Sequence, residues 1–110
     1  MAKYKFKYWY EWGERDCFLW AADDATGQAF GTEVSYIETD KLPLSEELKQ
    51  FLRETAILHD CSLNWEYPPD PPSPEDWTPE MAAEFDRRAH EAYRRICEEL
   101  GDDYEIIYAV

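Results

Sequence analysis

The sequence predicts an α+β fold, in which an antiparallel sheet of about four strands carries two main helices on one face. Three observations predict this class: an N-terminal segment that alternates lysine with aromatic residues, two later segments with apolar residues at helical spacing, and a β-branched C-terminal segment. An ordered strap, rich in proline and aromatic residues, is expected between the two helices. At 110 residues, the chain is expected to form one domain, residues 1–110.

Four segments are predicted to be strands. Residues 3–12, KYKFKYWYEW, have the period-two pattern of a strand with one buried aromatic face. Residues 17–22, CFLWAA, are apolar on both faces, as a central strand would be, and an antiparallel hairpin with the first segment is expected. A short third strand is expected over 32–38. Residues 104–110, YEIIYAV, are expected to pair with a strand that is distant in the sequence.

A short helical turn is expected within residues 23–31, with Asp23 or Asp24 as its N-cap. The first main helix is predicted over residues 46–59. Ser45 would cap it, and its apolar stripe would be Leu48, Phe51, Leu52, Thr55 and Ala56.

The second main helix is predicted to begin after Thr78 as N-cap, with Pro79 in its first position, and to end at Gly101. Its apolar positions recur at helical spacing: Met81, Phe85, Ala89, Ala92, Tyr93, Ile96 and Leu100. Arginine pairs at 87–88 and 94–95 lie among glutamates and an aspartate on this helix, so intrahelical ion pairs are expected rather than a phosphate-binding patch.

The charge of the chain restricts its partners. The 25 acidic and 11 basic residues give a net charge of −14, which disfavours direct binding of nucleic acid or an anionic membrane and favours a basic protein partner. Residues 45–80 hold nine of the acids against Lys49 and Arg53. No continuous apolar run of membrane-spanning length is present, and the N-terminus lacks the apolar core of a signal peptide, so a cytoplasmic protein is expected.

No catalytic residue, metal site or cofactor is expected, and the predicted protein is not an enzyme. The three cysteines, Cys17, Cys61 and Cys97, form no close pairs and are expected to be reduced packing residues. Together with His59 they lack the paired spacing of a structural zinc site. Adjacent carboxylates such as 46–47 and 98–99 are explained by helix capping and solvation.

Residues 62–80, SLNWEYPPDPPSPEDWTPE, form the predicted strap and contain five of the seven prolines between residues 68 and 74. Polyproline geometry is stiff, and its aromatic side chains are expected to pack over the helix ends and the sheet. One or two could also stay exposed among acidic residues as an anchor for a basic partner, and the two interpretations are compatible. The predicted partner-binding residues are Trp65, Glu66, Tyr67, Asp70, Glu75, Asp76 and Trp77 of the strap, with Glu46 and Glu47 of the first main helix.

Three motifs, CFLWAADDATGQAFG, LPLSEELKQFL and DCSLNWEYPPDPPSP, together resemble a group of small acidic bacterial proteins with no assigned activity. The resemblance covers about residues 17–74 and implies no catalytic residue. By size, acidity and fold class, the chain is also loosely similar to the immunity proteins that neutralise bacterial toxins.

The sequence therefore favours a non-enzymatic, acidic binding protein that inhibits or neutralises a basic protein such as a toxin or nuclease. Two alternatives stay open. One is a nucleic-acid mimic of the phage anti-defence type, and the other is a small ligand-binding or accessory protein with a pocket between sheet and strap.

Overall fold

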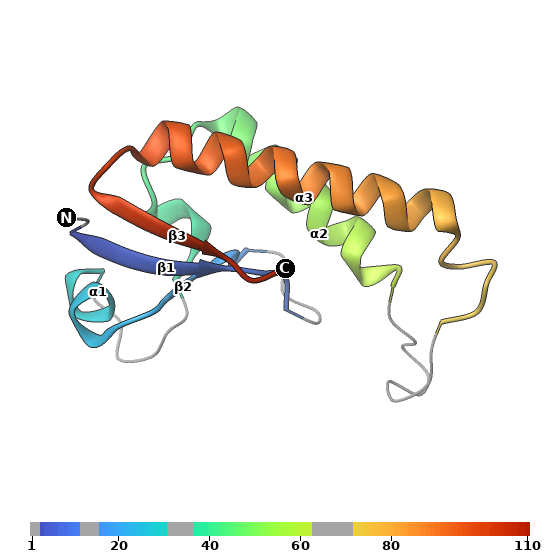
Figure 1. Ribbon diagram of the computed structural model, residues 1–110, viewed down its shortest axis with the longest axis horizontal. Helices are drawn as coiled ribbons and strands as arrows, with labels where there is room; N and C mark the ends of the chain where they lie inside the picture. The colour runs from blue at the N-terminus through green and yellow to red at the C-terminus, as the bar shows by residue number, and fades with distance from the viewer. Residues whose placement is uncertain (1–2, 12–15, 31–36, 63–71) are drawn as a thin grey trace.

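The computed structural model describes residues 3–11, 16–30, 37–62 and 72–110. The described elements form an α+β arrangement of three strands, three α-helices and one 3-10 helix (Figure 1). The predicted class is therefore confirmed, while the strand number and the pairing differ from the prediction.

The described sheet is mixed rather than antiparallel. Its strands are β1 (Tyr4–Tyr8), β2 (Leu19–Ala21) and β3 (Tyr104–Tyr108), in the order β2-β1-β3. β1 pairs antiparallel with β2, as the predicted hairpin requires, but parallel with β3. The antiparallel prediction is wrong for β3 because α3 carries the chain back to the end of the sheet where β1 begins, so both strands run in the same direction.

The central strand of the described sheet is β1, not β2 as the apolar segment 17–22 suggested. β1 alternates as predicted: Phe6 and Tyr8 are fully buried, while Lys5 and Lys7 are exposed. The apolar character of the second segment has a different cause, because Cys17 and Phe18 are buried ahead of a strand of three residues.

The third predicted strand, 32–38, lies mostly outside the described residues. Of its positions, Ile37 is buried and Glu38 is exposed, and neither belongs to a strand. A short 3-10 helix, η1 (Thr39–Lys41), follows them and was not predicted.

The helices begin where the sequence predicts. α1 (Asp24–Ala29) is capped by Asp23, α2 (Glu46–Asp60) by Ser45, and α3 (Pro79–Leu100) by Thr78. In each case the side-chain oxygen of the cap accepts a hydrogen bond from the backbone N–H three residues later. Gly101 ends α3 with a φ of 77°, a conformation that glycine adopts without a steric penalty.

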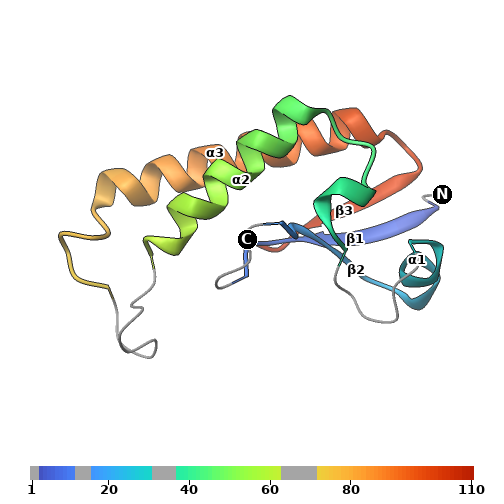
Figure 2. The same ribbon diagram turned by 180° about the vertical axis from the view of Figure 1, so that it is seen from behind.

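α2 and α3 run antiparallel on one side of the sheet, and α2 lies in front of α3 in the view of Figure 2. A single apolar cluster joins them to the strands, with Leu48, Leu52 and Ala56 of α2 facing Ala89, Ala92 and Ile96 of α3. These residues belong to the predicted stripes. In the described part of the chain, no helix combines the length and apolarity needed to cross a membrane.

Candidate partner-binding site

The described end of the strap, residues 72–80, is an ordered turn that leads into α3. The Ser73 carbonyl oxygen accepts hydrogen bonds from the backbone N–H groups of Asp76 (3.0 Å) and Trp77 (3.2 Å). The Ser73 hydroxyl donates to the Asp76 carboxylate at 2.9 Å. Glu75 and Asp76 are exposed on this turn, while Trp77 is half-buried. The turn therefore presents two carboxylates next to a partly covered indole ring.

Trp77 forms part of an open pocket of about 360 Å³, which we call the aromatic pocket. Its lining residues are Trp9, Tyr10, His59, Ser62, Trp77, Phe85, Ala109 and Val110. Phe85 is the shared contact: its ring centroid lies 5.4 Å from Tyr10, 5.4 Å from His59 and 6.4 Å from Trp77. These offset and edge-on contacts are the favoured arrangements of aromatic rings.

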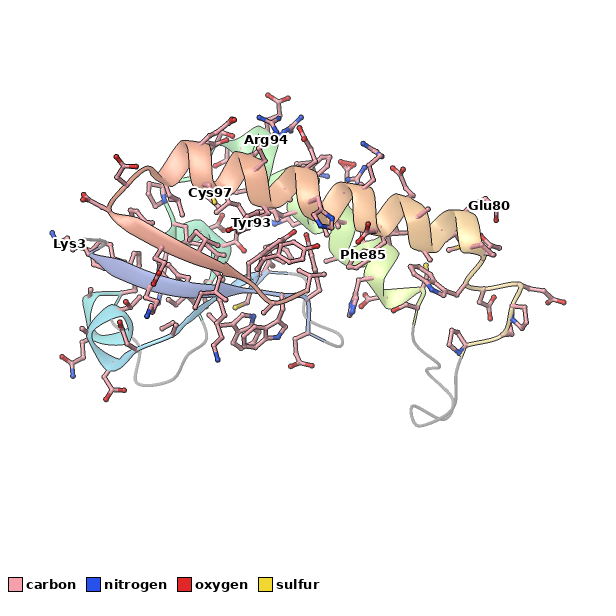
Figure 3. The ribbon with its side chains drawn as sticks, in the orientation of Figure 1. Lys3, Glu80, Phe85, Tyr93, Arg94 and Cys97 are labelled. Carbon is pink, nitrogen blue, oxygen red and sulfur yellow. The ribbon has the colours of Figure 1, made fainter. Side chains whose placement is uncertain are left out.

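Five parts of the chain build the aromatic pocket. Part of the wall comes from each of the segment after β1, the C-terminal end of α2, the turn before α3, the first half of α3 and the segment after β3. Figure 3 marks Phe85 on the side of α3 that faces α2, while Arg94 is on the outer side of the same helix. The antiparallel packing of α2 and α3 thus places the end of one helix beside the beginning of the other.

The charge around the aromatic pocket is neutral to negative. Burial among the rings lowers the pKa of His59, although the nearby carboxylates of Asp60 and Glu11 act in the opposite direction. His59 is therefore a neutral imidazole at pH 7. Among the described residues that line the pocket, none is a lysine or an arginine.

Glu46 and Glu47 lie at the opposite end of α2, and the structure does not bring them together with the described part of the strap. α2 has 15 residues, a length of about 22 Å. Their surroundings also differ, because cations are present. Lys49 pairs with Glu46 (3.3 Å) and Asp40 (3.5 Å), and Arg53 pairs with Asp16 (2.7 Å) and Asp40 (3.2 Å).

The predicted site is thus described in part. Glu75, Asp76 and Trp77 are neighbours on the turn before α3, and Glu46 and Glu47 are remote from them. Trp65, Glu66, Tyr67 and Asp70 lie outside the described residues.

Sequence reasoning missed Trp9, Tyr10, His59 and Phe85 as parts of a site. Phe85 was assigned to the buried stripe of its helix and Tyr10 to the buried face of its strand. Packing in the core was therefore a sufficient explanation for both aromatic residues, and no pocket was inferred. The aromatic density of YWYEW at the end of the first strand was the available signal, but its partner segments are distant in the sequence.

Metal ligands do not converge in the part of the chain that the structure describes: no group of three or more His, Cys, Asp or Glu side chains could hold an ion there. Cys17 is buried, and Cys61 and Cys97 are half-buried free thiols. The groups that the described site presents are aromatic rings and, on the turn before α3, carboxylates.

The fold and this site define a class, a small acidic α+β protein with an open aromatic pocket. The chain belongs to the family described as Serratia CdiI immunity protein-like, whose sequence model matches residues 15–110. This match agrees with the looser similarity to toxin-immunity proteins seen in size, acidity and fold class. A comparison with curated proteins finds no match.

Proposed function

We propose that this protein is an immunity protein, which binds a toxin and blocks its activity without catalysing a reaction. The observation that carries the proposal is the family match over residues 15–110. The match includes every described helix, β2 and β3, and therefore most of the structure on which a partner could dock.

The toxin that fits this chain is a basic protein. A net charge of −14 repels polyanions and attracts a positively charged surface, and such attraction accelerates association at low salt. A nuclease with a basic substrate cleft is one such toxin, because its cleft already carries the charge that this protein complements.

The strap end is the favoured centre of the binding surface. Glu75 and Asp76 are exposed and form no ion pair with the described residues, so their charge is available to a partner. Trp77 beside them provides apolar surface of the kind that dominates binding energy. From the sequence, Trp65, Glu66, Tyr67 and Asp70 complete this surface.

Glu46 and Glu47 belong to the edge of the proposed surface. Lys49 already neutralises part of the charge at this end of α2, and exposed charges at the rim of an interface act more on association rate than on affinity.

A protection assay tests the proposal. A candidate toxin is expressed in a sensitive cell with and without the protein, and survival is measured. We expect wild-type protein to restore growth and the Glu75→Lys/Asp76→Lys variant to protect less. Asp102→Lys/Asp103→Lys is the matched control, since it makes the same charge change in the exposed turn before β3. Failure of the wild-type protein to protect or to bind the toxin contradicts the proposed function, and equal protection by both variants contradicts the proposed site.

A further inference from the structure

We propose that the aromatic pocket is a cage for a cationic side chain, an arginine or a lysine that the toxin inserts between Trp77, Phe85 and Trp9. This inference rests on the proposed function, because it names the chemical group that the immunity protein would recognise on its partner. It also makes a claim about the free protein that can be tested without any toxin.

The walls of the pocket supply the first argument. Trp9, Tyr10, Trp77 and Phe85 line it, and the faces of such rings carry negative electrostatic potential that attracts a cation within about 6 Å of the ring centroid. Tryptophan is the strongest of these partners, several rings around one site form the known cage for quaternary ammonium groups, and arginine makes such ring contacts more often than lysine does.

The chain already contains the same contact elsewhere. The guanidinium carbons of Arg88 and Arg95 lie 4.2 Å and 5.0 Å from the Phe51 ring centroid, between α2 and α3. These contacts are internal, so that ring is occupied. The aromatic pocket differs because no arginine or lysine is among its described lining residues.

The charge around the pocket supplies the second argument. His59, the imidazole among the lining residues, is neutral at pH 7 because its burial lowers its pKa. Glu11 and Asp60 are close enough to act on that pKa, and Glu75 and Asp76 are exposed on the turn that ends at Trp77. A cation entering the pocket therefore meets aromatic rings with carboxylates nearby, and these carboxylates disfavour an anion.

The size of the pocket sets the third constraint. A volume of about 360 Å³ is near the lower end of the roughly 300–1,000 Å³ range of ligand sites. One long side chain fits this volume better than a folded segment does. Arginine is favoured over lysine because its planar guanidinium can stack on one ring while it donates hydrogen bonds to a carboxylate.

An apolar side chain is the competing occupant of the pocket. The test distinguishes the two by comparing a charged probe with a neutral one of the same shape. The probes are n-butylguanidinium and the neutral n-butylurea, which has the same shape. Each is titrated into the free full-length protein while NMR follows the indole N–H resonances. We expect n-butylguanidinium to shift the Trp77 and Trp9 resonances in a saturable way and n-butylurea to shift them at least about tenfold more weakly.

Two variants locate the binding. Trp77→Leu should weaken n-butylguanidinium binding about tenfold, and Tyr104→Leu should leave it unchanged, since this half-buried ring packs against Tyr4 outside the pocket. Glu75→Gln/Asp76→Asn keeps every ring and should weaken the guanidinium alone, which keeps the test decisive if Trp77→Leu does not fold. Equal shifts from both probes, or guanidinium shifts that neither pocket variant reduces, overturn the cage.

The toxin provides a second arm that separates the two proposals. If wild-type protein binds the toxin and a folded Trp77→Leu variant binds it equally tightly, the cage is wrong as a recognition site while the proposed function stands. If wild-type protein does not bind the toxin, the proposed function fails, and the probe titration still decides whether the pocket takes a cation.

Discussion

At the residue scale, the protonation of His59, which lines the aromatic pocket, makes the stability of the protein depend on pH. Burial beside Tyr10 and Phe85 lowers its pKa below the ordinary value of 6.5. The unfolded chain therefore takes up a proton at higher pH than the folded protein does. As a result, stability falls as the pH decreases below about 6.5 and continues to fall until the folded protein is protonated as well.

Replacing His59 with glutamine removes this titration. We expect the loss of unfolding free energy between about pH 7.5 and about pH 5.5 to be smaller in His59→Gln than in the wild-type protein. Urea denaturation at the two pH values measures the difference. Identical slopes in wild type and His59→Gln would show that burial of His59 does not act on stability.

Tyr8 ties the sheet to α3 through a buried pair of hydroxyl groups. Its hydroxyl donates to the Ala89 carbonyl oxygen at 3.0 Å, so the Tyr10 hydroxyl, 2.8 Å away, donates to the Tyr8 oxygen. Burial raises the pKa of both phenols far above the physiological range. Both stay neutral, and the pair works as a fixed hydrogen-bond link.

Tyr8→Phe leaves the Ala89 carbonyl and the Tyr10 hydroxyl without this partner inside the core. We expect the free energy of unfolding to fall by about 1–2 kcal/mol. Tyr4→Phe is the control, because the Tyr4 hydroxyl makes no hydrogen bond to the described residues and its ring stays packed on Phe30. Chemical denaturation at pH 7 measures both variants. A loss under about 0.5 kcal/mol in Tyr8→Phe would show that the link is dispensable.

At the element scale, Arg88 holds α2 against α3. Its guanidinium donates to the Thr55 hydroxyl at 3.0 Å and to the Phe51 carbonyl oxygen at 3.2 Å, and it lies over the Phe51 ring. The neighbouring Arg87 is exposed and pairs within α3 with Glu84. The sequence predicted intrahelical pairing for all four arginines, which holds for Arg87, Arg94 and Arg95 but not for Arg88.

The two adjacent arginines give a matched pair of variants. Arg88→Lys should cost about 1–2 kcal/mol of unfolding free energy, because lysine cannot form the two hydrogen bonds and the stacking contact together. Arg87→Lys should cost less than about 0.5 kcal/mol, as expected of an exposed ion pair. Thermal and urea unfolding of the two variants measure the difference. Equal losses would contradict the interhelical role of Arg88.

The helices could be predicted and the sheet order could not, for a physical reason. Ser45 and Thr78 cap their helices through local hydrogen bonds, and the apolar spacing that follows is a property of one segment. The parallel pairing of β1 with β3 depends on how α3 returns the chain, which no single strand encodes. The same limit applies to the site: Trp77 was predicted from its own segment, but His59 reaches the Phe85 ring only through the packing of α2 on α3.

At the scale of the whole molecule, charge and apolar surface are distributed unequally. On the exposed face of α3, ion pairs such as Arg94 with Glu91 and Glu98 balance the acids. At the strap end, Glu75 and Asp76 lack such partners among the described residues. The overall excess of acids should attract a basic partner from a distance, and the aromatic pocket would fix it on contact.

The different roles of the overall charge and of the aromatic pocket predict different effects on the association rate and on the dissociation rate. Glu46→Gln/Glu47→Gln, at the remote end of α2, should lower the association rate with the toxin a few-fold and leave the dissociation rate nearly unchanged. Trp77→Leu should raise the dissociation rate instead. Surface plasmon resonance separates the two constants. A change of dissociation rate alone in the glutamine variant would place α2 at the centre of the interface rather than at its edge.

The central claim, that the protein neutralises a basic toxin by binding it, is tested most directly by titrating the purified toxin with wild-type protein at low and high salt in a calorimeter. The account predicts a saturable complex that inhibits the toxin, with a dissociation constant that rises at least about tenfold between about 50 mM and about 300 mM NaCl. The absence of binding at about 50 mM NaCl, or a complex whose affinity does not change with salt, would contradict it.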